Sequence, residues 1–479
     1  MKKKKILTFL VASLFQLVVL DHAVAQTFTT LHNFAGYPSE GAYLNGGLIL
    51  SGNTLYGTTQ SGGSSGNNGT VFKINANGTG FTNLYSFTAT PLYTNSDGAN
   101  PSELVLSGNT LYGTTYHGGS SENGTVFAIN TNGAGFTTLH NFTEVSGPFP
   151  STNSDGARPY AGLILSGNTL YGTTPSGGSS GSGTVFKVNT NGTGFTTLHS
   201  FIDASDGASP AELVLSGNTL YGTTSRGGTV NNLGTVFAVN TDGTGFTNLH
   251  SFTGVSDGAN PDAGLILSGN TLYGTASAAN EGGGVNGTIF AINTNGTGFT
   301  TLHNFTATPF SPPYGNSDGA DPVARLILSG TTLYGTAVRG GNSGNGTVFA
   351  VNIDGTSFTN LHSFTALSNS TNSDGANLNA GLILSSNTLY GAAYRGGSSG
   401  FGTIFSLSLS PPQLSIIPSG ANVILKWPTY APGVTLQSTM NLVSPAVWST
   451  NPPAPVLVNG QNTVTNAISG TQKFYRLSQ

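Results

Sequence analysis

One block of sequence recurs seven times along the chain, and no other feature restricts the possible folds as strongly. The tripeptide LYG begins at residues 55, 111, 170, 220, 272, 333 and 389. The motif GT[VI]F follows each copy and begins at residues 69, 124, 183, 234, 287, 346 and 402. A repeat of this length is one supersecondary unit that stacks on its neighbours to bury a core. The sequence therefore predicts a repeat architecture.

Each repeat contains four apolar runs, which we name A to D in chain order. In residues 103–142 they read ELVLS, TLYGTT, GTVFAIN and FTTLHNF. Gly108-Asn109 separates A from B, and such a two-residue link between apolar runs is typical of a β-hairpin. Seven units of four antiparallel strands predict an all-β fold, a seven-bladed β-propeller. A solenoid is the alternative, although its units are usually shorter and need polar caps, which neither end of the repeat region shows.

The first and last units are each incomplete. Residues 28–34 read as a D strand with no C strand before it, whereas the seventh unit ends after its C strand, residues 402–408. We therefore predict that residues 28–34 pair with residues 402–408 and close the ring, which removes two open sheet edges. Deletion of residues 26–35 should then cause early unfolding or aggregation.

The sequence motifs of the repeat resemble those of a known family. The blocks GLILSGNTLYGTT, GTVF and NGTGFTTLHNF resemble the Gloeo-Verruco (GloVer) tandem-repeat family of secreted bacterial proteins. The resemblance covers about residues 27–409. It implies export and a tandem-repeat β fold, but it implies no established activity and provides no catalytic residue.

The N-terminus reads as a secretory signal. Four lysines precede an apolar run at residues 6–20, and Ala23-Val24-Ala25 is typical of a cleavage site. We therefore expect residues 1–25 to be removed, and a secreted or cell-surface protein with no membrane span after cleavage. The absence of cysteine excludes disulfides and thiolate chemistry. The chain has no basic stripe, which argues against nucleic acid as a partner, and we expect a monomer.

The sequence pattern changes after the last repeat. Residues 26–409 are predicted to form the propeller and residues 410–479 a small C-terminal β domain resembling a sandwich, with Trp427 in its core. A structural or sorting role and a glycan-binding role remain open for this domain.

Two repeated positions suggest metal chemistry but have simpler interpretations. Every D-to-A loop contains an acid: Glu40, Asp97, Asp155, Asp206, Asp257, Asp318 and Asp374. Calcium is one interpretation, but one carboxylate a loop favours an Asp-Gly turn. The D strands carry histidines: His32, His140, His199, His250, His303 and His362. Tyr85 replaces histidine in the first complete unit, which indicates packing rather than metal binding, and no metal or cofactor is predicted.

Positions that depart from the repeat consensus are the candidate ligand-binding residues. In a propeller the long D-to-A and B-to-C loops share one face, which we call the loop face. The B-to-C loops differ at His117, Arg226, Arg339 and Arg395. Strand A begins with Glu103, Glu212 and Arg325 where other units have glycine, and these three should stand near the central channel. Ordinary surface variation is the alternative.

The composition of the surface indicates a class of binding partner, but it does not indicate a particular reaction. Only 7% of residues are charged, so the loops must be rich in hydroxyl and amide groups. This favours a secreted non-catalytic binding or scaffold protein, with an extracellular glycan or a cell-surface component as its partner. The alternative is a glycan-active enzyme, a polysaccharide lyase or hydrolase on the same face, for which Tyr116, His117, Glu103 and Glu212 are the nearest candidates. We identify no catalytic residue from the sequence.

Overall fold

The computed structural model describes most of the chain. The described residues are 27–90, 94–254, 256–277, 286–309, 315–409, 414–428, 435–440, 447–450, 454–458, 461–467 and 473–478. The predicted export signal, residues 1–25, lies outside them. Among the described helices, none combines the length and apolar character that a membrane crossing requires.

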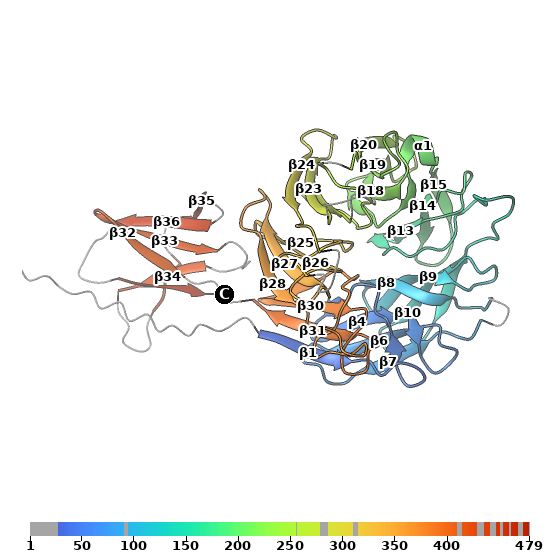
Figure 1. Cartoon of the computed structure of the whole chain (residues 1–479), viewed down its shortest axis with the longest axis horizontal. Helices are drawn as coiled ribbons and strands as arrows, with labels where there is room; N and C mark the ends of the chain where they lie inside the picture. The colour runs from blue at the N-terminus through green and yellow to red at the C-terminus, as the bar shows by residue number, and fades with distance from the viewer. Residues whose placement is uncertain are drawn as a thin grey trace, which may run out of the picture.

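The repeats form seven antiparallel sheets that resemble propeller blades, and we number these blades 1 to 7 in chain order. In Figure 1 they follow one another around a circle, from blue to orange. The A strands are β3 (Ile49–Ser51), β8 (Ala99–Ser107), β12 (Ile164–Ser166), β17 (Val214–Ser216), β21 (Ile266–Ser268), β25 (Ile327–Ser329) and β29 (Ile383–Ser385). The B strands are β4 (Thr54–Thr59), β9 (Thr110–His117), β13 (Thr169–Thr174), β18 (Thr219–Arg226), β22 (Thr271–Ala276), β26 (Thr332–Ala337) and β30 (Thr388–Ala393).

The outer two strands of each blade complete the four-stranded pattern. The C strands are β6 (Thr70–Asn75), β10 (Thr125–Asn130), β14 (Thr184–Asn189), β19 (Thr235–Asn240), β23 (Thr288–Asn293), β27 (Thr347–Asn352) and β31 (Thr403–Ser408). The D strands of blades 1 to 6 are β7 (Thr82–Ser86), β11 (Thr137–Asn141), β15 (Thr196–Ser200), β20 (Thr247–Ser251), β24 (Thr300–Asn304) and β28 (Thr359–Ser363). Short loop elements are β2 (Gly41–Ala42), β5 (Ser61–Gly62), α1 (Asp203–Asp206) and β16 (Ala208–Pro210), which adds a fifth strand to blade 4.

The N-terminal strand completes the last blade. β1 (Thr27–Asn33) pairs antiparallel with β31, with Phe28 opposite Leu407 and Asn33 opposite Thr403. The sheet order β1-β31-β30-β29 places β1 in the D position of blade 7. Figure 1 shows β1 and β31 side by side. The predicted pairing of the first strand with the last unit is therefore confirmed.

Hydrophobic clusters join each blade to the next. One cluster joins blades 6 and 7, where Tyr334 packs in the same core as Phe405, with Phe28 of β1 against it. Another contains Phe72 of blade 1, Ile404 of blade 7 and Phe34, which is fully buried. Blade 7 therefore packs on blade 1, and the N-terminal segment contributes to the clusters on both sides of blade 7.

The recurring glycine of LYG and the phenylalanine of GTVF fit one another. A Cβ atom on Gly57 would lie 2.6 Å from Cζ of Phe72 and 2.9 Å from Cδ2 of Leu48. Phe72 is fully buried in strand C, directly opposite Gly57 in strand B. The same pair recurs in every blade. The glycine therefore provides the space that the aromatic ring fills, which accounts for both repeat motifs through close packing.

The repeated acids and histidines contact one another at the rim of the ring. In blade 2, Nε2 of His140 lies 3.0 Å from Oδ2 of Asp155, which also accepts a hydrogen bond from the backbone N–H of Thr143. The imidazole stacks on Phe195 of blade 3, with ring centroids 3.7 Å apart. Equivalent pairs join the other histidines to their acids, and Tyr85 donates its hydroxyl to Asp97 at 2.8 Å.

These contacts confirm that the carboxylates bind backbone N–H groups and that the histidines pack. They also show a connection that the sequence did not predict, because the acid and the histidine are partners. Each D strand contains a β-bulge, at which its pairing register with strand C shifts by one residue. In blade 7 the pair is His32 with Glu40, and His32 stacks on Phe81 of blade 1. The rim contact is thus present at the closing junction as well.

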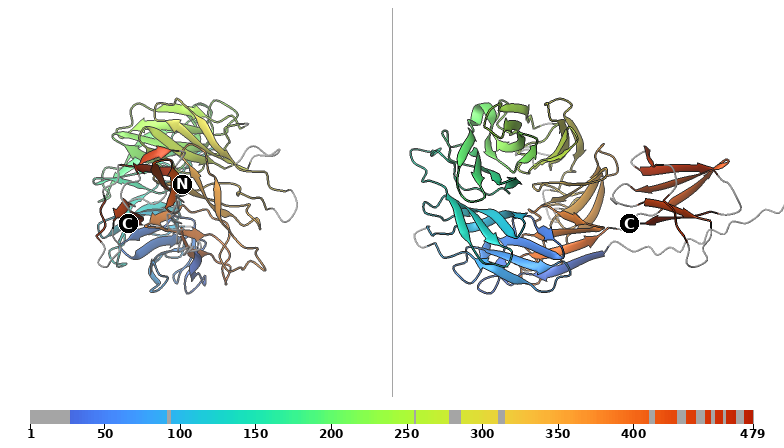
Figure 2. Two further views of the ribbon diagram at one scale, coloured as in Figure 1. Left: turned by 90° about the vertical axis from the view of Figure 1, so that its left-hand side faces the viewer. Right: turned by 180° about the vertical axis from the view of Figure 1, so that it is seen from behind.

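The C-terminal strands form a group outside the ring (Figure 2). One sheet has the order β32 (Ser415–Ser419), β33 (Asn422–Pro428), β36 (Gln461–Ala467) and β35 (Val456–Val458). The other pairs β34 (Thr435–Thr439) with β37 (Phe474–Ser478). Trp427 is 2% exposed and shares a small core with Leu425, Leu436 and Val464, as the sequence predicted for this tryptophan.

Candidate functional site

One position near the start of strand A faces a cavity on the axis of the ring in all seven blades. We call it the axial position, and it holds Gly47, Glu103, Gly162, Glu212, Gly264, Arg325 and Gly381. Charged residues thus alternate with glycines around the ring, from blade 1 to blade 7. The three candidates that the sequence placed near the channel, Glu103, Glu212 and Arg325, do lie together there.

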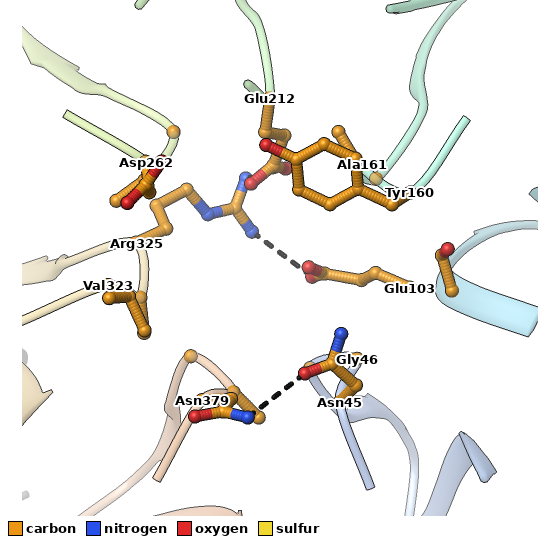
Figure 3. Close-up of a pocket in the computed structure, with 18 of the residues that line it drawn as sticks. Asn45, Gly46, Glu103, Tyr160, Ala161, Glu212, Asp262, Val323, Arg325 and Asn379 are labelled. Carbon is orange, nitrogen blue, oxygen red and sulfur yellow. Dashed lines mark hydrogen bonds and ion pairs between the residues drawn. The ribbon is translucent and has the colours of Figure 1, made fainter. Parts of the chain in front are cut away.

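Arg325 joins the two glutamates across the axis. Its Nη1 donates a hydrogen bond to Oε1 of Glu212 at 2.7 Å, and its Nη2 lies 3.7 Å from Oε1 of Glu103. Figure 3 shows the guanidinium between the two carboxyl groups. Only 10% of the Glu212 side chain is exposed, against 39% for Arg325. One cation therefore serves two carboxyl groups and keeps part of its surface open to the cavity.

The glycines of the axial position leave room for these charged side chains. A Cβ atom on Gly47 would lie 2.8 Å from Oε1 of Glu103, and one on Gly264 would lie 2.7 Å from Oε2 of Glu212. Neither glycine has a left-handed φ angle, so the backbone itself does not require glycine there. Glycine at these two positions therefore leaves space that the carboxyl groups of Glu103 and Glu212 occupy.

A second layer of side chains stands two residues earlier in the chain, toward the loop face. It contains Asn45, Tyr160, Asp262, Val323 and Asn379. Nδ2 of Asn379 donates to Oδ1 of Asn45 at 3.2 Å, and Ser277 donates its hydroxyl to Asp262 at 3.1 Å. The two layers enclose a cavity of about 360 Å³, which lies within the usual size of a small-molecule site. Figure 3 shows the Tyr160 ring above this space.

The electrostatics of the cavity depend mainly on burial. Burial raises the pKa of Glu212 to about 7, with Arg325 opposing and Glu103 reinforcing the shift. Burial also raises the pKa of Asp262 above its usual value, despite hydrogen bonds from Ser277 and Ser225 and the nearby charge of Arg226. The pKa of Arg325 is raised, first by Glu212, which keeps it a cation. The cavity therefore combines a fixed positive charge with carboxyl groups that hold protons more tightly than usual.

A second cavity of about 680 Å³ adjoins the same three charged residues from the opposite side. Its walls are the aliphatic residues of strand A in blades 1, 2, 3 and 7, such as Ile49, Leu106 and Leu165. Glu103, Glu212 and Arg325 line both spaces. They lie between a chamber toward the loop face and a second chamber, walled mainly by aliphatic residues, toward the short turns.

The candidates in the B-to-C loops are not brought together. Arg339 pairs with Asp321, and Arg395 lies over the ring of Tyr394, 5.6 Å from its centroid. Arg226 donates to Oγ of Ser209 at 3.1 Å and lies close enough to Asp262 to act on its pKa. These three arginines therefore lie in separate surroundings around the loop face.

His117 is also apart from the axial cluster. It lies edge-on to Tyr116 with ring centroids 4.6 Å apart, and its buried Nδ1 has no hydrogen-bond partner in the described part of the chain. Burial and the nearby Arg158 lower its pKa. Within the described residues, no group of three or more acids and histidines has the geometry to hold a metal ion.

The sequence missed the second layer of the cavity. Asn45, Tyr160, Asp262 and Asn379 stand two residues before the axial position, where the other blades have Pro101, Pro210 and Val323. This position also varies between repeats, so alignment of the seven units could have identified it. The neighbouring D-to-A loops vary in length, which hides the position until the strand is placed.

Comparisons with known proteins concern the repeat and the fold. The family model of the Gloeobacter/Verrucomicrobia repeat matches residues 13–154, 149–316 and 311–420. No curated protein sequence matches the chain. A solved nidogen/laminin complex is similar at 13% identity and a TM-score of 0.39, over 64% of this chain and 91% of that one.

Two solved enzymes also show similarity at low identity. Oligogalacturonate lyase in complex with manganese is similar at 9% identity and a TM-score of 0.45, over 81% of this chain and 97% of that one. The GH74 enzyme of Niastella koreensis is similar at 15% identity and a TM-score of 0.48, over 85% of this chain and 61% of that one.

Proposed function

The chain belongs to the Gloeobacter/Verrucomicrobia repeat family, and we propose that it is a secreted, non-catalytic binding protein that holds an extracellular glycan in the axial pocket of a closed seven-bladed β-propeller. Seven blade-like sheets, the packing of blade 7 on blade 1 and the pairing of β1 with β31 support this architecture. The N-terminal sequence supports export. The protein acts as a monomer without a metal or cofactor, and nucleic acid is not its partner.

The single observation that carries the proposal is the composition of the axial cavity. Its main polar groups are two carboxyl groups and a guanidinium in the first layer, and two amides, a phenol and a third carboxyl group in the second. Sugar hydroxyls can donate to the carboxyl groups and accept from the amides and from the guanidinium. The Tyr160 ring offers an apolar face beside these groups (Figure 3), and a few convergent polar groups in a concave site are typical of ligand pockets.

The cavity meets the loop face, where a chain-like ligand has access. The second-layer residues lie directly after the D-to-A loops, and the adjoining loops are rich in serine, asparagine and glycine. Neutral loops around a polar pocket suit a hydroxyl-rich polymer, whose end enters the cavity while the next units lie against the loops. A rigid ring of strands holds these loops in place, as in other proteins that bind through loops on a scaffold.

A glycan array tests this function together with a turnover screen on the glycans that bind. We expect retention of a defined set of glycans without release of reducing ends or unsaturated products. Asn379→Ala removes one amide of the Asn45–Asn379 pair and should weaken retention without a change in melting temperature. An array without any bound glycan would contradict the proposal.

A second candidate function is hydrolysis or elimination at the same site. The observation that favours it is the pKa of Glu212, which burial raises to about 7, because a carboxyl group that keeps its proton near neutral pH can act as a general acid. Glu103 is the second carboxyl group, on the other side of Arg325. Turnover that is lost in both Glu103→Gln and Glu212→Gln would favour the enzyme over the binding module.

A further inference from the structure

A second group of unusual side chains lies on the loop face, where blade 2 meets blade 3. It consists of Tyr116 and His117 at the end of β9, Glu122 in the following B-to-C loop, and Arg158 in the D-to-A loop that leads into blade 3. All four residues are half-buried. The backbone N–H of Arg158 donates to the carbonyl oxygen of Asn123 at 2.8 Å and joins the two loops. Three separate segments of the chain therefore meet at this junction.

Two of these residues have left-handed backbone conformations that suit smaller residues. Arg158 has a φ angle of 62° and Glu122 one of 64°. The position of Arg158 holds asparagine, aspartate or serine in five blades and Tyr43 in blade 1. The position of Glu122 holds only glycine or asparagine in the other blades where the structure describes it. Long side chains are strained in this conformation, and such strain gathers at functional sites.

The local hydrogen bonds of the repeat are incomplete at this junction. Asn100, Ser209 and Asn260 take the place of Arg158 in their blades, and each donates to a backbone carbonyl of the preceding blade at 2.8, 3.2 and 3.0 Å. By contrast, the ion pairs formed by the described residues do not include Arg158. Nδ1 of His117 is buried without a hydrogen-bond partner in that part of the chain. Such buried atoms are rare, so the junction is poorly explained by packing alone.

The electrostatic potential at His117 is positive. Arg158 acts to lower the pKa of His117 and Glu122 acts to raise it, and the effect of Arg158 is the larger of the two. Tyr116 adds a hydroxyl group, and its ring lies edge-on to His117 with centroids 4.6 Å apart. A guanidinium presents a planar fork of donors that fits the oxygens of a carboxylate or sulfate. The junction therefore combines positive charge with hydrogen-bond donors, with Glu122 opposing.

We propose that Arg158, His117 and Tyr116 bind an oxyanion on a sugar unit, a carboxylate or a sulfate ester, at a site separate from the axial cavity. The two sites are neighbours, because Tyr116 lies close enough to Tyr160 of the cavity to act on its pKa. A glycan with a neutral unit in the axial cavity can thus place an acidic unit at this junction. The inference goes beyond the proposed function, on which it rests for the glycan as the carrier of the anion.

Proton uptake offers a second signature of this contact. The titratable and charged groups that face His117 are Tyr116, Glu122 and Arg158. Burial and Arg158 lower the pKa of His117 in the free protein, whereas an oxyanion beside the ring favours the imidazolium and raises this pKa. Binding near pH 6 should therefore take up a proton, which calorimetry in two buffers of different ionisation enthalpy detects. His117→Gln should abolish the uptake, and binding without any uptake in the unaltered chain would contradict the contact.

The decisive experiment compares three β-1,4-linked tetrasaccharides that differ only at C6 of each unit: glucose, glucuronic acid and glucose 6-sulfate. We would measure their binding to the full chain by calorimetry. We expect an acidic ligand to bind at least about tenfold more tightly than the glucose ligand, with a preference that declines as salt screens the charges. Tighter binding of glucuronic acid identifies a carboxylate as the anion, and tighter binding of the sulfated ligand identifies a sulfate ester.

Matched variants assign the preference to this junction. Arg158→Gln removes the guanidinium and should reduce the preference for the acidic ligand to within about twofold. Arg395→Gln removes the same charge from an exposed residue of blade 7 and should keep the preference. Asn379→Ala alters only the axial cavity and should weaken all three ligands while the preference remains. Melting curves show that each variant is folded, and an equal loss of preference in both arginine variants would overturn the site.

The outcomes separate this inference from the proposed function. Equal binding of the three ligands, or tighter binding of glucose, overturns the anion site and leaves the glycan function standing. If no glycan on the array binds, the proposed function fails, and inorganic sulfate then tests the anion site alone. Sulfate should bind the unaltered chain and not Arg158→Gln, and equal results for both chains would overturn the inference.

Discussion

The rim and the axis are made from the same seven repeats, yet the repeats have nearly the same residues at the rim and different residues at the axis. At the rim, six units use histidine and one uses tyrosine to contact an acid of the following loop. At the axis, four units have glycine, two have glutamate and one has arginine. Each rim residue contacts its own acid and the neighbouring blade, so the same residue type can be used in every blade. The axial residues share a single space, where seven long side chains cannot fit and seven like charges would repel.

The largest expected effect is at the rim, where β1 closes the ring. Deletion of residues 26–35 removes Phe34, which is fully buried, and Phe28, which packs on His362 and Phe405. Burial of each aromatic ring contributes about 2 kcal/mol, and the lost strand pairing adds about 1 kcal/mol for each hydrogen bond. We expect aggregation or a melting temperature lower by more than about 10 °C.

Removal of the C-terminal strands provides the control. A chain that ends after Leu409 keeps β1, β31 and all seven blades, so its main unfolding transition should remain near that of the full chain. An unchanged melting temperature after deletion of residues 26–35 would show that closure by β1 is unimportant for stability.

The rim was largely predictable because its determinants are local and repeated. Strand order, the seven units and the pairing of residues 28–34 with the last unit follow from motif spacing and a missing strand. The pairing of His140 with Asp155 does not follow from the motifs, because the histidine and the acid lie in different segments and the β-bulge beside His140 has no clear sequence signal. The order of the strands was therefore easier to predict than the contacts between loops and strands.

The pH dependence of stability should have opposite signs at the two regions. Burial acts to raise the pKa of Asp155, Asp257 and Asp318, but hydrogen bonds from the paired histidines and threonines outweigh it and hold each pKa below its usual value. Stability from these groups is present above their unfolded pKa of about 3.9 and is lost as the pH falls through the lower folded values. The free energy of unfolding therefore falls in acid, by about 1.4 kcal/mol for each unit by which folding lowers the pKa of such a group.

Glu212 acts in the other direction. Its pKa of about 7 in the folded chain lies above the unfolded value, so its contribution is full below about pH 4.3 and is lost as the pH rises through 7. Melting curves from pH 3 to pH 9 should decline at both ends, and Glu212→Gln should flatten only the alkaline side. An unaltered alkaline decline in this variant would contradict the assignment.

A single rim contact should have a moderate effect. His140→Phe keeps the stack on Phe195 but removes the ring nitrogen that lies 3.0 Å from Asp155. This should lower the free energy of unfolding, measured in urea, by about 1–2 kcal/mol. His140→Tyr is the matched control, because Tyr85 already donates to Asp97 in blade 1, and it should be nearly neutral. Equal losses in both variants would mean that ring shape rather than the hydrogen bond matters at the rim.

The axial site was only partly predictable. Glu103, Glu212 and Arg325 stand out because they interrupt a run of glycines at an aligned position. That Arg325 joins both glutamates depends on side-chain reach across the ring, which repeat spacing does not contain. Tyr160 and Asp262 follow loops of different length, so their shared position emerges only when the seven strands are aligned, and the structure then places them in the cavity.

The clearance around the charged residues provides a matched test at the axis. Gly264→Ala places a methyl group 2.7 Å from Oε2 and 2.9 Å from Cβ of Glu212, whereas Gly381→Ala meets no atom closer than the carbonyl oxygen of Arg325 at 3.4 Å. Neither φ angle is left-handed, so both variants should fold. We expect a several-fold loss of glycan affinity for Gly264→Ala alone, measured by calorimetry. Equal affinities would show that the glycines do not serve the site.

The smallest effect should come from Arg339 and Arg395, which do not line the axial cavity. Arg339 is largely exposed and pairs with Asp321 at the surface, and such pairs contribute about 0–1 kcal/mol. Arg395 contacts the ring of Tyr394 and does not line the axial cavity. The double variant Arg339→Ala, Arg395→Ala should therefore keep both its melting temperature and its glycan affinity within about twofold. Arg226 is left intact because it acts on Asp262 of the cavity. A loss of affinity beyond about tenfold would move the binding surface from the axis to the loops, and the variation among the B-to-C loops would then have the role that we assign to the axial position.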